Sequence, residues 1–246
     1  MINNITVTPP IARPALPVRA IRWLWRVAAD SVYRNVMWLY FVRPKRAFQP
    51  FNDTLNDRYP DIFSFAQSQL GATNKVKILS YGCSTGDEVF SLRQYFPNAA
   101  IKGIDINPAN IAVCRKRLNA ASDSGIAFQT ASSSEQESSA TYDAIFFVAV
   151  LRHGSLGLHG VTRCDHLIRF EDFARAVADF ERCLKPGGLL IMRHSNFRLC
   201  DAPAGRVFET ILQLPTGPRT PLFGPDNRLL PDREYPDTVF RKKRAR

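Results

Sequence analysis

Apolar and polar positions alternate in blocks along most of the chain after Gly71. Short apolar runs rich in Val, Ile and Phe are separated by longer segments with helical spacing. The predicted strands are 76–82, 101–106, 126–131, 142–151 and 189–195, with 237–240 as a last edge strand. The predicted helices are 87–96, 110–118 and 170–184, and "KPGG" at 185–188 is a predicted turn. Strands that alternate with helices predict right-handed crossovers, and so an α/β fold with a Rossmann-like, doubly wound, mostly parallel sheet.

The first seventy residues follow a different pattern. Residues 1–18 are rich in proline and are predicted to be extended or disordered. From Ile21 to Val42 charged residues recur at every fourth position and apolar residues lie away from them, which predicts a helix that Pro44 ends. Its tryptophans and arginines fit either a helical cover packed across the main domain or a peripheral helix on a membrane surface.

These patterns divide the chain into four parts. An extended N-terminal segment, 1–18, precedes a helical cover and substrate-side element, 19–70. The main domain covers 71–240, and a basic tail covers 241–246.

The net charge of +11 lies at the two ends of the chain. Residues 1–50 carry +7 and the terminal "RKKRAR" carries +5, which leaves the body at −1. Terminal charge of this kind attracts anions loosely, and no nucleic-acid-binding motif accompanies it. We therefore expect no specific nucleic-acid partner.

Five cysteines occur, an odd number without paired metal-ligand spacing. No cleavable signal is recognisable, and no apolar run of about 18 residues occurs. We therefore expect reduced thiols, no metal site and a cytoplasmic location, with peripheral contact at the inner membrane face through 21–42 as the alternative.

The stretch "ILSYGCSTGDEVFSL" places two glycines, Gly82 and Gly86, between a predicted strand and a predicted helix. In a doubly wound sheet, ligands bind beyond the carboxyl ends of the strands at this position, where free N–H groups at a helix start favour an anion. Asp105 ends the next predicted strand, and an acid at that place accepts hydrogen bonds from ribose hydroxyls. The turn is therefore predicted to bind a nucleoside ligand.

Two such ligands compete. A dinucleotide requires G-x-G-x-x-G, but Ser84 and Asp87 occupy the third and sixth places. Asp87 and Glu88 would also repel a pyrophosphate, whereas they suit an ammonium group beside a carboxylate. The charges therefore favour the methionine end of S-adenosyl-L-methionine as the cofactor.

The segments "GCSTGDE", "GIDIN" and "LKPGG" together resemble the class I S-adenosylmethionine-dependent methyltransferases. Within that class, "LSYGCSTGDEVFSL" is similar to the turn of the chemotaxis-receptor glutamate methyltransferases, which reads close to "SAGCSTGEEPYSL". Those enzymes carry N-x-T-x-x-x-R before the first strand, and "NDTLNDR" matches it here. Their "HSE" after the fifth strand is matched by "HSN" at 194–196. The resemblance covers roughly residues 50–200.

The resemblance and the turn together give a set of cofactor-binding candidates. Asp87 or Glu88 is expected to meet the donor's amino group, and Asp105 the ribose. Arg58 and Thr54, by resemblance, would close over the methionine carboxylate, unless Thr54 caps a helix and Arg58 pairs with Asp57 or Asp61. The complete set is Asn52, Thr54, Arg58, Gly82, Cys83, Ser84, Gly86, Asp87, Asp105 and Ile106.

The acceptor side is expected near the ends of the fourth and fifth strands. His153 follows the fourth strand and is the predicted catalytic residue with Arg58, since a histidine can take a proton from a hydroxyl or ammonium acceptor. His194, Arg152 and Tyr59 are substrate candidates; the arginines near these histidines, Arg152 and Arg193, could hold an acidic acceptor.

The sequence departs from the glutamate methyltransferases where "FVAVLRHG" replaces a segment like "CRNVLIYF", so that His153 takes the place of a tyrosine. There is also no room for a full receptor-docking domain. We therefore expect a methyltransferase with a small-molecule acceptor. The alternatives are a protein carboxyl (glutamate) methyltransferase and a non-catalytic protein that binds the cofactor.

Overall fold

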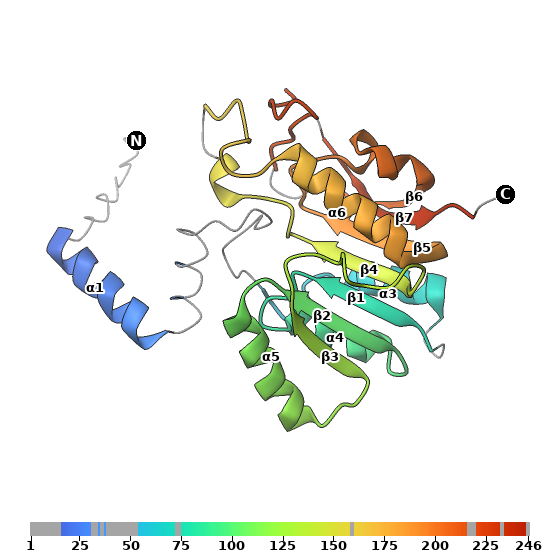
Figure 1. Cartoon of the computed structure of the whole chain (residues 1–246), viewed down its shortest axis with the longest axis horizontal. Coiled ribbons are helices and arrows are strands. Elements are labelled where there is room, and N and C mark those ends of the chain that lie inside the picture. The colour runs from blue at the N-terminus through green and yellow to red at the C-terminus, as the bar shows by residue number, and fades with distance from the viewer. Residues whose placement is uncertain are drawn as a thin grey trace, which may run out of the picture.

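The computed structural model of the 246-residue chain describes residues 16–30, 34, 37, 54–71, 75–157, 160–215, 220–231 and 234–244. One seven-stranded sheet runs through the described residues in the order β3-β2-β1-β4-β5-β7-β6 (Figure 1). Its strands are β1 (Lys77–Tyr81), β2 (Ala100–Asp105), β3 (Ile126–Thr130), β4 (Tyr142–Val148), β5 (Leu184–Arg193), β6 (Phe208–Gln213) and β7 (Asp237–Lys242). The predicted doubly wound α/β fold is confirmed.

The first five strands are parallel, and the chain reverses its direction of travel across the sheet at β1. β1 pairs with β2 on one side and with β4 on the other. The carboxyl ends of β1 and β4 therefore lie side by side at the switch point, where doubly wound sheets bind ligands.

Helices cover both faces of the sheet (Figure 1). On one face lie α3 (Pro60–Leu70), α4 (Asp87–Tyr95) and α5 (Pro108–Ala121), which share a buried cluster with Ile78 and Phe146. On the other face lies α6 (Phe170–Cys183). Its buried Phe173, Val177 and Phe180 recur at helical spacing and pack against Tyr81 and Phe147. β1 and β4 are therefore buried on both faces along most of their length, as the continuous apolar run of 142–151 predicted for β4, whereas β3 alternates buried and exposed residues.

The carboxy-terminal strands differ from the prediction. β7 is an inner strand, antiparallel to β5, and the unpredicted β6 forms the edge beyond it. β7 also continues through Lys242, whose Nζ lies 2.7 Å from a carboxylate oxygen of Glu181. The domain therefore extends past residue 240, and the first residues of the expected basic tail are part of the sheet.

The "KPGG" turn is present, but as an irregularity within β5. Tyr142 pairs with Leu184, and the register then shifts so that Ala144 pairs with Leu189. Gly187 has a φ of +82°, which glycine adopts without strain.

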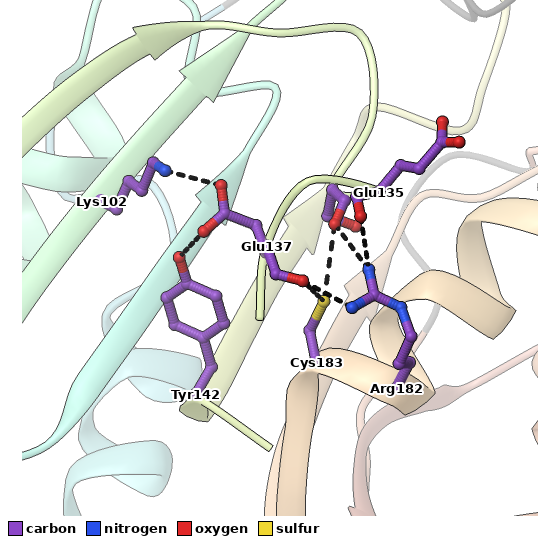
Figure 2. A network of polar contacts seen from close by, with 7 residues as sticks. Lys102, Glu135, Glu137, Tyr142, Arg182 and Cys183 are labelled. Atoms are coloured by element: carbon purple, nitrogen blue, oxygen red, sulfur yellow. Dashed lines mark hydrogen bonds and ion pairs between the residues drawn. The ribbon is translucent and has the colours of Figure 1, made fainter. Parts of the chain in front are cut away.

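The loop after β3, predicted as a surface loop, is fixed by polar contacts (Figure 2). The Glu137 carboxylate accepts hydrogen bonds from Lys102 Nζ and Tyr142 Oη, each at 2.6 Å. Arg182 Nη2 donates to the carbonyl oxygens of Ser134 and Glu135, each at 3.0 Å. These bonds connect the loop to β2, to the start of β4 and to the end of α6.

The amino-terminal helix differs in extent and in packing. α1 (Leu16–Ala29) begins within the segment expected to be extended, and Asp30 is not helical, so 21–42 is not one unbroken helix. Ile21, Leu24 and Trp25 are 65%, 58% and 72% exposed. The expected packing of this helix across the main domain is therefore absent from the described residues. None of the described helices is long and apolar enough to cross a membrane.

Candidate functional site

The turn after β1 has an unusual backbone. Gly82, Ser84 and Gly86 have φ values of +72°, +50° and +95°. Ser84 is one of three non-glycine residues with left-handed φ at neighbouring strand ends; the others are Ala149 after β4 and His194 after β5. Such conformations cost roughly 1 kcal/mol or more each and cluster at functional sites, which marks this edge of the sheet.

The two glycines serve packing as well as turn geometry. A Cβ on Gly82 would lie 2.5 Å from a Val150 methyl carbon, and one on Gly86 would lie 3.1 Å from Cys114 Sγ. Cys83 is buried in the cluster beneath α4 and α5. The Cys83 side chain is therefore part of the protein interior, and the predicted backbone contacts of Gly82, Cys83 and Gly86 with a ligand stay predictions.

Asp105 holds the turn in place. Its Oδ2 accepts from Ser84 N at 2.9 Å, and its Oδ1 accepts from Asn107 N at 2.8 Å and Asn110 Nδ2 at 3.1 Å. Burial raises the pKa of this carboxyl, and the three donors act in the opposite direction. A carboxylate has about four lone-pair sites, so one remains for a ligand hydroxyl.

Several groups beside Asp105 fit a nucleoside cofactor. Ser84 Oγ is buried and has no hydrogen-bond partner among the described residues. Ile106 is partly buried and directly follows Asp105, so it offers an apolar surface. An unpaired hydroxyl, a free carboxylate lone pair and the N–H groups at the start of α4 match the polar groups of S-adenosylmethionine.

The two acids at the start of α4 face different ways. Asp87 forms an ion pair with Arg117 Nη1 of α5 at 2.7 Å. Glu88 instead faces β1, where its Oε1 accepts from Ser80 Oγ at 2.7 Å. No described cation forms an ion pair with Glu88, and burial raises the pKa of this carboxyl to about 7. Asp87 thus already has a cation partner and Glu88 has none among the described residues, so which of the two meets an ammonium group stays a prediction.

Residues 54–59 lie against α4. Asp57 N donates to Ser91 Oγ at 2.8 Å, and Tyr95 Oη donates to Asp57 Oδ1 at 3.0 Å. Thr54 is partly buried and caps no described helix. The structure thus brings the upstream motif to the glycine turn, although Asn52 lies outside the described residues. Ser91 holds this segment through its hydroxyl, and no pattern in the sequence had predicted that role.

Arg58 and Tyr59 extend from that segment towards β5. The Arg58 guanidinium lies over the Tyr59 ring, 5.4 Å from its centroid, and the Tyr59 and His194 rings are 5.9 Å apart. Tyr59 Oη is buried without a partner among the described residues. Burial raises the pKa of Tyr59, so the hydroxyl keeps its proton.

His194 lies among positive charges. Burial, followed by Arg193, Arg152 and Arg58, lowers the pKa of His194 to about 4. The imidazole is therefore neutral at physiological pH and retains one nitrogen lone pair. Of the predicted acceptor-side residues, the structure brings together Tyr59, Arg58, Arg152 and His194.

His153 is placed differently. The residue is 6% exposed, and its imidazole Nδ1 accepts a hydrogen bond from the backbone N–H of Ser155 at 3.3 Å. The backbone N–H of His153 donates to Asn196 Oδ1 at 2.8 Å. Asn196 also bonds to Leu151 O and Pro221 O. The loops after β4 and β5 are therefore joined through Asn196 and the His153 backbone, while the catalytic role predicted for the His153 imidazole stays a prediction.

A shallow hollow lies between α6 and the loop after β3. Tyr81, Ser132 and Asp179 are among its lining residues. Ser134, in the same lining, has a buried hydroxyl without a partner among the described residues. The loop after β3 therefore places hydroxyl groups in this lining.

Substitution of Gly82 by alanine tests the turn geometry. Gly82→Ala forces a Cβ against Val150 in a left-handed conformation, so we expect it to lower the free energy of unfolding by about 1–3 kcal/mol in urea titration. Gly154→Ala is the matched control, because its Cβ meets nothing within 4 Å. Equal effects of the two substitutions would contradict this account.

Comparisons with known proteins identify the family. A model described as "Methyltransferase domain" matches residues 72–214, more than half of the chain. No curated protein matches the sequence. Among solved structures, the chain is 13% identical to geranyl diphosphate C-methyltransferase from Streptomyces coelicolor A3(2), with a TM-score of 0.41 over 54% of this chain and 45% of that one. It is 14% identical to phosphoethanolamine N-methyltransferase 2 from Haemonchus contortus, with a TM-score of 0.43 over 68% and 34%.

The chain spans half or less of the length of these two structures. The family assignment rests on the match to residues 72–214 alone. The chain therefore belongs to the methyltransferase-domain family.

Proposed function

We propose that the enzyme transfers the methyl group of S-adenosylmethionine to a small-molecule acceptor. The observation that carries this proposal is the position of Tyr59, which lies between the start of α4 and His194 with a buried, unpaired hydroxyl. Asp57, two residues before Tyr59, is bonded to α4, and the Tyr59 ring lies beside His194. A partly buried polar site of this kind suits a small acceptor.

The donor would be held along the carboxyl edge of β1 and β2. Its ribose would meet the free lone pair of Asp105, and its apolar purine the side chain of Ile106. The N–H groups at the start of α4, with Thr54 and Arg58, would hold the methionine carboxylate, and Asn52 remains a candidate by resemblance. Glu88, which lacks a cation in this structure, would meet the ammonium group.

When bound, the donor supplies a methyl group on a positively charged sulfur, and the thioether that leaves is neutral. No acid is needed for the leaving group, so the task of the protein is to position the acceptor and exclude water. A hydroxyl or ammonium acceptor must also lose a proton. His194, neutral above about pH 4, can accept a hydrogen bond from such a group.

A protein carboxyl methyltransferase is the alternative, because the turn and the upstream motif resemble the chemotaxis-receptor glutamate methyltransferases. Here the Arg58–Tyr59 segment already lies over the site, which favours a small acceptor over a protruding loop of a partner protein.

Incubation of the enzyme with methyl-labelled donor and a dialysed or undialysed lysate separates the two functions. We expect label to enter compounds that remain soluble in acid, and dialysis of the lysate to abolish the transfer. Glu88→Gln should reduce the transfer at least tenfold, since a buried charge-assisted contact would be lost. Label that precipitates with protein and is released by mild base would instead support the alternative.

We further propose that α1 binds an anionic membrane surface. Exposed Ile21, Leu24 and Trp25 lie on one stripe of the helix, and Trp23 is also 42% exposed. The sequence of α1 contains three arginines and no acid. A basic helix with exposed apolar side chains matches the interface of anionic lipids.

Vesicle flotation tests this proposal. The full chain should float with vesicles that contain phosphatidylglycerol and much less with pure phosphatidylcholine. Ile21→Asp combined with Trp25→Asp should abolish flotation, whereas Leu229→Asp, at another exposed apolar side chain, should not. Flotation of the double variant at the wild-type level would contradict the proposal.

A further inference from the structure

Two arginines meet at the acceptor side of the site from neighbouring strand ends. Arg193 is the last residue of β5 and pairs in register with Val148, the last residue of β4. Arg152 lies four residues after Val148, in the loop that follows β4. Asn196 bonds this loop to the segment after β5. The paired strand ends and the shared loop contacts thus hold both guanidinium groups near His194.

Neither guanidinium is neutralised within the described part of the chain. Arg193 Nη2 donates to Pro215 O at 3.0 Å, and no carboxylate of a described residue lies within ion-pair distance of Arg193 or Arg152. Elsewhere in the domain many arginines do have such partners: Arg93, Arg117, Arg163, Arg175, Arg182, Arg198 and Arg228.

The groups facing His194 from other elements do not cancel this charge. Arg58, from the segment before α3, adds a third cation that acts on His194. Glu88 of α4 is the acid that acts on Tyr59, but it bonds to Ser80 and has a pKa of about 7. The acceptor side is therefore a partly buried region with a positive potential.

Tyr59 adds a directional group to this potential. Its hydroxyl is buried, keeps its proton and lacks a partner among the described residues, so it is a donor without an acceptor. A buried donor left unpaired costs about 1–3 kcal/mol, and an oxygen atom of a ligand would remove that cost.

We propose that the acceptor carries a carboxylate or phosphate group, which Arg152, Arg193 and the Tyr59 hydroxyl hold while another atom of the acceptor is methylated. This inference rests on the proposed function, because it assigns the substrate class of the same site. The anionic group is the point of attachment: charge-assisted hydrogen bonds from two arginines reduce the nucleophilicity of its oxygens and fix its position. The atom that is methylated would then face the donor and His194.

The same arrangement gives His194 a second role. Arg193 and Arg152 contribute to the low pKa of His194. An anion bound to them offsets their charge, so the pKa of His194 rises when the acceptor binds. The imidazole then becomes a better proton acceptor in the complex than in the free enzyme.

Sulfate is the first probe of this site, because its charge does not change near neutral pH. Calorimetry on the enzyme saturated with S-adenosylhomocysteine should show that Arg152→Gln/Arg193→Gln weakens sulfate binding about tenfold or more. Tyr59→Phe should weaken it by a smaller factor, roughly threefold to tenfold. Arg169→Gln/Arg206→Gln removes the same charge from two exposed arginines and should change the affinity less than about twofold.

Two further measurements sharpen the comparison. Proton NMR should show the pKa of His194 rising on addition of sulfate in the wild type and not in the Arg152→Gln/Arg193→Gln variant. Acetate and methyl phosphate then distinguish a carboxylate from a phosphate, because the group that the acceptor carries should bind more tightly.

Equal sulfate affinity in the two double variants, or an unchanged pKa of His194, would overturn the inference. The affinity for S-adenosylhomocysteine should be the same in the wild type and in both double variants. If S-adenosylhomocysteine does not bind the wild type, the proposed function is wrong. The anion site can then still be tested by comparing sulfate binding to the wild type and the variants without S-adenosylhomocysteine.

Discussion

The site depends on one buried carboxylate, Asp105, and the three N–H groups that it accepts. These bonds join the turn after β1 to the end of β2 and the start of α5. A buried carboxylate is stable only with such donors, and a left-handed serine is stable only when its surroundings hold it. The Asp105 carboxylate and the left-handed Ser84 therefore stabilise each other. Together they fix the position of the start of α4.

Charge is divided across the site in a way that matches two different ligands. On the side of β1 and β2 lie the acids Asp105 and Glu88, which suit hydroxyl and ammonium groups. On the side of β4 and β5 lie Arg152 and Arg193, without carboxylate partners in the described structure. The first side matches the cofactor of the family, and the second leads to our proposal of an anionic acceptor.

The central sheet was predictable because short apolar runs alternate with helical segments along the chain, and its central strand β4, buried on both faces, reads as a continuous apolar run. β6 was not predicted, since five of its six residues are at least partly exposed and its sequence lacks alternation. Its presence makes β7 an inner strand. α1 was predicted as a helix from its periodicity, but periodicity alone does not reveal which surface, if any, covers its apolar side.

The candidate site was predictable in its position and less so in its individual residues. One step along a helix rotates a side chain by about 100°, so the sequence could not distinguish Asp87, which faces α5, from Glu88, which faces β1. Likewise, His153 and His194 both follow strands. The structure distinguishes them: His153 Nδ1 accepts from the backbone N–H of Ser155 in its own loop, whereas the His194 ring lies beside Tyr59.

Proton release on cofactor binding tests the central claim most directly, namely that Glu88 meets the ammonium group of the donor. At pH 6 a carboxyl with a pKa of about 7 is mostly protonated, and an adjacent ammonium group would lower that pKa and expel the proton. Calorimetry of S-adenosylhomocysteine binding in buffers of different ionisation enthalpy should therefore show close to one more proton released by the wild type than by Glu88→Gln. At pH 8 this difference should nearly vanish, because Glu88 is already ionised. Equal proton release by the two proteins at pH 6 would contradict the account.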